Sequence, residues 1–195
     1  MPTGVAIRDV RAQLFDAAER VLLRAGPSGL TSRAVTTEAG CAKGVLHKHF
    51  ADFDAFLAEF VLDRVDRMDP QAAALREAAG TGSIVDNLTA ALRALYASVA
   101  VAVVPLIAFR DELRARLRDT WPAGVPVLTE AATMFAEYLA AERDLGRIAA
   151  DADVDTLGAM LIGTGQLLFA DRTGPPPEPE RVHRMVSVIV GRISR

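Results

Sequence analysis

Apolar residues recur every three to four positions along most of the chain, and this spacing predicts helices. In residues 6–25 the apolar side chains share one helical face, so we expect a first helix that Gly26 and Pro27 end. No stretch alternates apolar and polar residues as a half-buried strand would. Further helices are expected over residues 31–39, 43–50, 53–68, 84–104, 105–118, 127–143, 154–169 and 181–193, with a short one between Pro70 and Gly80. The prediction is an all-α protein of about nine helices.

The two C-terminal helices are unusually apolar. Residues 154–169 are nearly free of charge, and a helix that is apolar almost all round must be buried. Residues 181–193 carry a wide apolar face, and the four prolines within 171–180 predict a stiff linker before it. Two environments explain this pattern, the interior of one subunit and an interface with a second subunit.

Residues 30–50 predict a DNA-reading motif. Thr31 can cap a short helix that runs to about Ala39, because its side-chain oxygen can accept an otherwise unpaired backbone N–H. Gly40 allows the left-handed backbone that ends such a helix, and a second short helix starts near Lys43. Two short helices joined by a tight turn form a helix-turn-helix, whose second helix can enter the major groove of DNA.

The side-chain directions agree with this motif. Leu46 and Phe50 lie four residues apart on one face, where they can pack on Val35 and Ala39 of the first helix. Gly44 removes a side chain where the backbone can approach a phosphate. The side chains left to project towards solvent or DNA are Lys43, His47 and Lys48.

Charge is distributed unevenly. The chain has a formal net charge of −3 and a pI near 5.6, which argues against a generally basic nucleic-acid binder. Residues 30–50 are locally cationic, however, since they hold Arg33, Lys43 and Lys48 against Glu38 alone. A modest local patch suits a dimer, which presents twice that charge to DNA. Arg8 and Arg11 can either reach a phosphate or remain solvated surface.

Cysteine use and hydropathy predict a soluble, cytoplasmic protein. Cys41 is the one cysteine, so no internal disulfide can form, and the N-terminus lacks the order of a signal peptide. The longest uncharged apolar run lies between Arg93 and Arg110 and is interrupted by Pro105. It is shorter than the roughly 20 residues that a membrane span needs. Cys41 is expected to fill a small apolar space, and redox sensing is the alternative.

The sequence of residues 29–57 resembles the TetR family of bacterial transcriptional regulators. The resemblance rests on the spacing of Gly29-Leu30-Thr31, Ala39-Gly40, the run from Lys43 to Phe50, then Asp54 and Leu57. It implies a DNA-binding domain at residues 1–50 and a helical domain for effector binding and dimerisation at residues 51–195. The helix over residues 53–68 would connect them.

The resemblance also implies roles for individual residues. Phosphates would be touched by Thr31, Arg33, Lys48 and His49, bases would be faced by Lys43, Val45 and His47, and Gly44 would lie close to the backbone of the DNA. Helices 154–169 and 181–193 would pair with their copies in a homodimer that binds a palindromic operator. Four positions depart from the family pattern. His47 and His49 stand where tyrosines are common. Ala42 stands where a serine usually caps the second helix, and Phe53 stands where a lysine often touches a phosphate.

Catalytic and metal-binding patterns are missing. No His or Cys cluster has the spacing of a zinc site, and no serine or cysteine has an evident base partner, so we expect no metal, no cofactor and no enzyme activity. Glu130, Glu137 and Glu142 are interpreted as solvated charges. An apolar pocket with a few polar groups can be built from Tyr96, Phe109, Trp121, Phe135, Tyr138, Thr164 and Gln166, although an ordinary core would contain the same residue types.

These observations support one main hypothesis and two alternatives. The main hypothesis is a DNA-binding repressor that a small, largely apolar effector releases from its operator. The first alternative is a regulator that has no effector. The second is a helical small-molecule-binding protein whose head has lost DNA binding, which only Ala42 and Phe53 favour.

Overall fold

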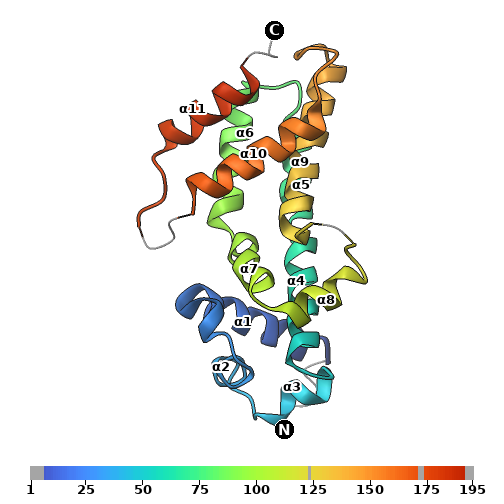
Figure 1. Ribbon diagram of the computed structural model, residues 1–195, viewed down its shortest axis with the longest axis vertical. Coiled ribbons are helices and arrows are strands. Elements are labelled where there is room, and N and C mark those ends of the chain that lie inside the picture. Colours follow the sequence, from blue (N-terminus) through green and yellow to red (C-terminus); the bar gives the residue numbers. More distant parts are fainter. Residues whose placement is uncertain (1–6, 123, 171–173, 192–195) are drawn as a thin grey trace. The chain divides into compact units, whose positions relative to one another are not determined.

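The structure is a computed structural model that describes residues 7–122, 124–170 and 174–191, with the side chains of residues 7–9 and 99–101 left undescribed. Within these ranges the chain is helical and forms no strand, so the all-α prediction is confirmed (Figure 1). The helices are α1 (Ile7–Gly29), α2 (Ser32–Glu38), α3 (Gly44–His49), α4 (Phe53–Asp66), α5 (Asp69–Glu77), α6 (Ile84–Ala97), α7 (Val99–Ala108), α8 (Asp111–Arg118), α9 (Pro126–Asp144), α10 (Val154–Leu168) and α11 (Pro179–Val190).

The chain folds into two compact units. The head unit comprises Met1–Arg64 and Ala102–Val125, and the body unit comprises Val65–Val101 and Pro126–Arg195. The head unit therefore includes a segment that follows α6 by sequence. The predicted functional boundary near residue 50 stays a prediction, since compactness alone does not say which residues bind DNA.

The helix-turn-helix of the head unit is built from local signals. Thr31 caps α2, since its hydroxyl oxygen accepts the Ala34 N–H at 3.1 Å. Gly40 then adopts a φ of 66°, its N–H donates to the Thr37 carbonyl, and the Cys41 N–H donates to the Thr36 carbonyl. This pair of bonds is a Schellman motif, which stops the helix at a left-handed residue. The predicted cap and glycine stop are both present.

Aromatic packing joins α1, α3 and α4 within the head unit. Phe15, Phe50, Phe53, Phe56 and Phe60 form a chain of rings whose centroids lie 5.0–6.4 Å apart. Such offset and edge-on contacts add to the stabilisation from apolar burial. The predicted small core of Val35, Ala39, Leu46 and Phe50 is buried as expected.

Ionic contacts join α8 to the first turn of α4, also inside the head unit. Asp52 caps α4 by accepting the Ala55 N–H at 2.7 Å, and its second oxygen pairs with Arg116. Asp54 pairs with Arg110 at 3.0 Å. Arg110 also lies over the ring of Phe53, 5.4 Å from its centroid. We call this set the α4–α8 clamp.

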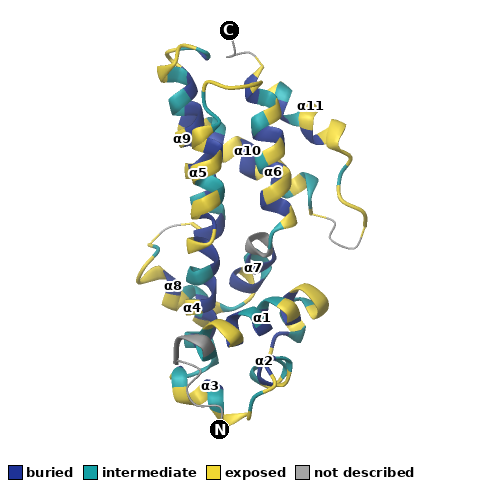
Figure 2. Cartoon of the chain, turned by 180° about the vertical axis from the view of Figure 1, so that it is seen from behind, coloured by how far each residue is buried: buried dark blue, intermediate teal, exposed yellow. Residues whose placement is uncertain are grey.

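The body unit is a helical stack in which α10 packs on α9, α11 packs on α6, and α5 contacts both α6 and α9 (Figure 1). Buried residues line these helices (Figure 2). Gly158 allows α10 to approach α9 closely, since a Cβ on it would lie 2.5 Å from the Ala132 carbonyl oxygen. Its small size therefore serves packing within one chain. Gly163 and Ala159, by contrast, lie on the exposed side of α10.

Several helix boundaries differ from the sequence prediction. The helix expected over residues 84–104 ends at Ala97, because Ser98 adopts an extended conformation with a ψ of 160°. Pro105 lies inside α7, and Pro70 belongs to the first turn of α5, where a missing N–H costs nothing. Within α1, Gly26 adopts a non-helical conformation with a φ of 67° and a ψ of −177°, so the first helical segment ends there as predicted, and a separate short turn that contains Pro27 runs to Gly29. Residues 192–193 of the predicted last helix and 171–173 of the predicted linker lie outside the described ranges.

Glu142 is fully buried, so the expectation that it is a solvated charge is wrong. It accepts the Tyr138 hydroxyl at 2.7 Å and pairs with Arg147 at 3.1 Å. The Gly80 N–H also donates to it at 3.3 Å, and Asn87 donates to the Tyr138 hydroxyl at 3.0 Å. Burial, and next the hydrogen bond to Glu142, raise the pKa of Tyr138, so its hydroxyl keeps the proton that it donates.

Membrane-spanning length is not reached by any single helix in the described residues. The bent pair Ile84–Ala97 and Ala102–Ala108 reaches it by length and composition only.

Candidate nucleic-acid interface

The exposed face of α2 and α3 carries most of the predicted DNA contacts. The exposed residues among them are Thr31, Arg33, Lys43, Gly44, His47 and Lys48, while Val45 and His49 are half-buried. All eight belong to the head unit and lie within one helix-turn-helix. The structure thus brings the predicted set together on one motif.

The cations on this face are not neutralised by acids. In the described part of the chain, Arg33, Lys43 and Lys48 form no ion pair. Arg20 and Arg24 of α1 differ, since their hydrogen bonds to Glu38 occupy them and lower the pKa of that carboxyl from its usual value. Unpaired, exposed cations are the groups that can displace counterions from phosphates.

The N-terminus of α3 lacks a side-chain cap. Lys43 stands at the N-cap position in a helical conformation and makes no capping hydrogen bond. The turn is closed instead by the Val45 N–H, which donates to the Ala42 carbonyl at 2.9 Å. Ala42 thus leaves unmade the hydrogen bond that a serine side chain would supply.

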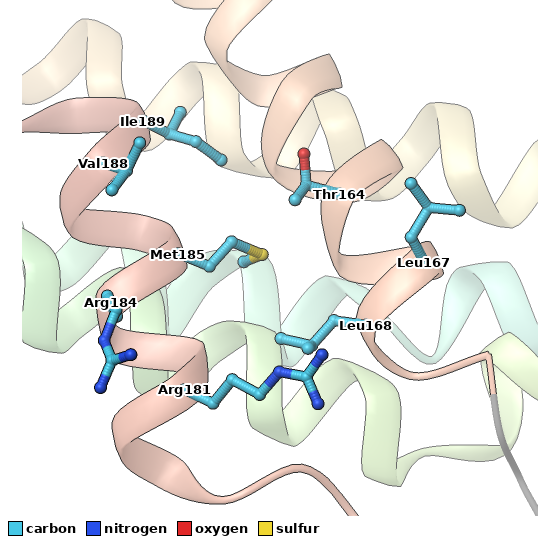
Figure 3. Close-up of a pocket in the computed structure, with 8 residues that line it drawn as sticks. All are labelled: Thr164, Leu167, Leu168, Arg181, Arg184, Met185, Val188 and Ile189. Atoms are coloured by element: carbon cyan, nitrogen blue, oxygen red, sulfur yellow. The ribbon is translucent and has the colours of Figure 1, made fainter.

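A second exposed surface lies on α10 and α11 of the body unit. Leu167 and Val188 are 80% and 74% exposed, and Met160 is 47% exposed. Figure 3 shows the hollow between these two helices, which we call the α10–α11 groove. Its volume is about 610 Å³ and its lining residues are Thr164, Leu167, Leu168, Arg181, Arg184, Met185, Val188 and Ile189. Exposed apolar side chains of both helices therefore gather at this groove.

Three of the predicted ligand contacts lie in the interior of the body unit. Tyr96 donates its hydroxyl to the Ile162 carbonyl at 2.7 Å, and its ring stacks on Phe169 at 4.4 Å. Phe135 and Tyr138 are fully buried on α9. The polar groups of both tyrosines are therefore already bonded within the protein.

The other four predicted ligand contacts lie elsewhere. Phe109 is 85% exposed and Trp121 is half-buried, and both belong to the head unit. Thr164 is exposed and lines the α10–α11 groove. Gln166 is half-buried, with its Oε1 lacking a hydrogen-bond partner among the described residues. Of the seven predicted residues, only Thr164 lines one of the grooves described here.

Two further hollows flank α5 in the body unit. The alanine groove, between α5, α6 and α9, has a volume of about 320 Å³ and is lined by Gln71, Ala74, Leu75, Ala78, Asn87, Ala90, Ala91, Ala94 and Met134. The acidic groove, between α5 and α9, has a volume of about 310 Å³ and is lined by Met68, Asp69, Ala72, Ala73, Arg76, Glu130, Thr133, Met134 and Glu137. Sequence reasoning missed both, because alanines at helical spacing look the same in a core and in a groove. No group of side chains that could hold a metal ion occurs among the described residues.

A capped helix, a left-handed glycine turn and a second short helix with exposed cations define a DNA-binding protein of the helix-turn-helix class. Residues 14–60 match the family described as bacterial regulatory proteins, tetR family. This match confirms, for the helix-turn-helix part of the chain, the TetR-family resemblance that the sequence predicted.

Solved structures share the fold over nearly the whole chain. A TetR transcription regulator from Haloarcula marismortui superposes with a TM-score of 0.71 at 16% identity, covering 97% of this chain and 100% of that one. A transcriptional regulator from Rhodococcus sp. Rha1 gives 0.67 at 22% identity, covering 94% and 95%. A putative transcriptional regulator from Saccharomonospora viridis, solved in complex with choline, gives 0.67 at 17% identity, covering 96% and 99%. No curated protein matches the chain. The family and these neighbours are transcriptional regulators.

Proposed function

We propose that the protein is a homodimeric repressor that leaves a palindromic operator when a small, largely apolar effector binds. The observation that carries the DNA-binding part is the helix-turn-helix face with its unpaired Arg33, Lys43 and Lys48. In the described residues these cations have no acid to satisfy them, so phosphates are their natural partners.

The roles within the head follow from position on the motif. Lys43, Val45 and His47 of the second helix face bases, while Thr31, Arg33, Lys48 and His49 contact phosphates. Thr31 can do this while capping α2, because a hydroxyl that accepts the Ala34 N–H still has its own proton to donate. Gly44 has nothing within 4 Å of a notional Cβ, so the DNA backbone can approach it.

Replacing Lys48 with alanine tests the phosphate role. In a dimer two contacts are lost, so the slope of log affinity against log salt should become shallower by about 1.8. Binding to the operator and to unrelated DNA should weaken by a similar factor, since a phosphate contact carries no sequence information. The measurement is fluorescence anisotropy at several salt concentrations. Arg20→Ala is the matched control, because it removes the same charge from a residue already paired with Glu38.

An unchanged slope in Lys48→Ala, or an equal change in Arg20→Ala, would contradict the assignment. Absence of any binding by the unaltered protein to DNA flanking its own or a neighbouring gene would instead favour a helical binding protein whose head no longer reads DNA. The uncapped α3 is the observation behind that alternative.

The dimer is proposed to form through α10 and α11. Exposed Leu167 and Val188 would be buried against their copies, as the family resemblance implies. The two heads would then read half-sites one helical turn apart, about 34–36 Å. Val188 and Leu167 come from different helices of the same groove, so both helices would contribute to a four-helix interface.

The effector is proposed to bind in the alanine groove. No charged residue lines this groove, and Gln71 and Asn87 are its polar groups, which suits a neutral, largely apolar molecule. The Nδ2 of Asn87 is already bonded to the Thr81 carbonyl and the Tyr138 hydroxyl. A hydrogen-bond donor on the ligand would therefore bind to the Asn87 Oδ1, which is an acceptor. The choline held by the Saccharomonospora viridis protein supports small-molecule binding by this fold.

Release from DNA is proposed to proceed through α4. A ligand that wedges α5 from α6 moves Asp69, which follows the end of α4 at Asp66 by three residues. A shift of α4 changes the spacing of the two heads. Binding that favours the released form by about 3 kcal/mol would weaken operator affinity roughly 100-fold. A gel shift that no small molecule relieves would favour the effector-free alternative.

Filling the alanine groove should abolish ligand binding there. We expect Ala91→Phe to lower the affinity for Nile red, a neutral apolar dye, at least about tenfold, because the ring occupies the groove that the dye needs. Ala73→Phe is the matched control, since Ala73 lines the acidic groove instead. Dye titration monitored by fluorescence gives both affinities. A loss in Ala73→Phe but not in Ala91→Phe would place the effector in the acidic groove.

A further inference from the structure

Two side chains of α1 donate hydrogen bonds to backbone carbonyls at the C-terminal ends of α2 and α3. Gln13 donates from Nε2 to the carbonyl of Ala39, the C-cap of α2, at 2.9 Å. Arg11 donates from Nη1 to the carbonyl of His49, the last residue of α3, at 3.4 Å. Carbonyls in the last turn of a helix lack partners within the helix and carry its partial negative charge. One helix thus supplies a donor to the C-terminal end of each of the other two.

Arg11 is held by two further contacts. Its guanidinium carbon lies 4.4 Å from the centroid of the Phe50 ring, and its other nitrogen pairs with Glu59 of α4. Its charge is therefore matched by a carboxylate, in contrast to Lys43 and Lys48 on the exposed face. The Arg11 side chain is 37% exposed, so its head is partly covered by the groups that it contacts.

We infer that Arg11 is a positioning residue that sets the orientation of α3, and that it does not serve as a phosphate ligand. The planar guanidinium stacks on Phe50 while it bonds the His49 carbonyl and Glu59, which fixes the C-terminal end of α3 against both α1 and α4. Gln13 fixes the C-terminal end of α2 in the same way. The inference rests on operator binding by this head.

The decisive experiment compares specific and non-specific binding. Arg11→Met should lower operator affinity about tenfold or more while affinity for unrelated DNA changes little, because a tilted α3 loses its base contacts and keeps its phosphate contacts. The slope of log affinity against log salt should stay unchanged. A phosphate ligand would behave differently, since its loss would lower both affinities alike and make the slope shallower by about 1.8 in a dimer.

A double variant and a conservative variant separate the effect of the lost charge from the effect of the lost contacts. Arg11→Met/Glu59→Gln restores the net charge, and we expect it to keep the loss of specificity. Arg11→Lys keeps the positive charge, but an ammonium group cannot stack on Phe50 and bond the His49 carbonyl in the same plane. This variant should therefore regain little of the operator affinity that Arg11→Met loses. Gln13→Met, which changes no charge, should lower the ratio of operator to unrelated DNA affinity through α2. Each protein is measured at a temperature well below its unfolding transition.

Hydrogen exchange without DNA supplies a second readout. The Phe50 N–H donates to the Leu46 carbonyl at 3.0 Å, and its exchange should speed up in Arg11→Met. The inference is overturned by equal weakening on operator and unrelated DNA with a shallower slope, or by full rescue in Arg11→Lys, or by unchanged affinity in Arg11→Met and Gln13→Met. Failure of the unaltered protein to bind any operator would instead overturn the proposed function, so the two failures are distinguishable.

Discussion

Replacing Glu142 with alanine should lower the free energy of unfolding by about 2–3 kcal/mol, because the buried Tyr138 hydroxyl loses its acceptor and the partly buried Arg147 guanidinium loses its counter-ion. Glu142 is 0% exposed, and it receives the Tyr138 hydroxyl, the Gly80 N–H and the Arg147 guanidinium. The Tyr138 hydroxyl would lose its acceptor in the interior, whereas Gly80 is exposed and the Arg147 side chain is 31% exposed, so water can reach these two donors. The measurement is urea unfolding followed by circular dichroism at one fixed protein concentration.

Glu137→Ala is the matched control for this prediction. Glu137 lies on the same helix and pairs with Arg76 at 3.0 Å, but both side chains are more than half exposed. Its removal should cost less than about 1 kcal/mol, as for other exposed pairs. Glu142→Gln, which can still accept the Tyr138 hydroxyl, should lie between the two alanine variants. Equal losses for Glu137→Ala and Glu142→Ala would show that the network around Tyr138 adds nothing.

Placing a charge on the outer face of α11 should split the proposed dimer. Val188→Asp would bury an unpaired carboxylate twice in a two-fold interface, and we expect the dissociation constant of the dimer to rise at least about 100-fold. Operator affinity should fall by a similar factor, because each head alone reads one half-site. Sedimentation velocity measures the assembly state, and fluorescence anisotropy measures operator binding.

The control for the dimer is another exposed apolar residue of the body unit. Leu145 is 58% exposed, lies beyond the end of α9, and lines none of the three grooves described above. Leu145→Asp should leave both the dimer and operator affinity unchanged. A monomeric unaltered protein, or a Val188→Asp protein that stays dimeric, would place the interface elsewhere.

The head could be predicted from sequence because its signals are local. A capping threonine, a glycine at a left-handed position and apolar residues four apart act within one or two turns, so Thr31, Gly40 and Leu46 were sufficient to predict α2 and α3. The break between α6 and α7 gave no such signal. Ser98 is flanked by helix-compatible residues, and its backbone is nevertheless extended.

Polar contacts between residues far apart in the chain could not be predicted from the sequence either. Glu142 looked solvated because acids usually are, although it lies four residues after Tyr138 and seven after Phe135, on their buried face. Its partner Gly80, and Asn87, which donates to the Tyr138 hydroxyl, are far away in sequence, so no local pattern predicted them. The ligand contacts were chosen as aromatic and polar residues, whereas the alanine groove is a hollow made by side chains that are small.

The α4–α8 clamp has a consequence for protein engineering. Its ion pairs join residues 56 and 64 positions apart in the chain, so the first turn of α4 is held by a segment that lies outside residues 1–64. A chimera that transplants only residues 1–64 onto a foreign sensor would leave Asp52 and Asp54 without their arginines and uncover the ring of Phe53. A working graft must carry residues 102–125 as well.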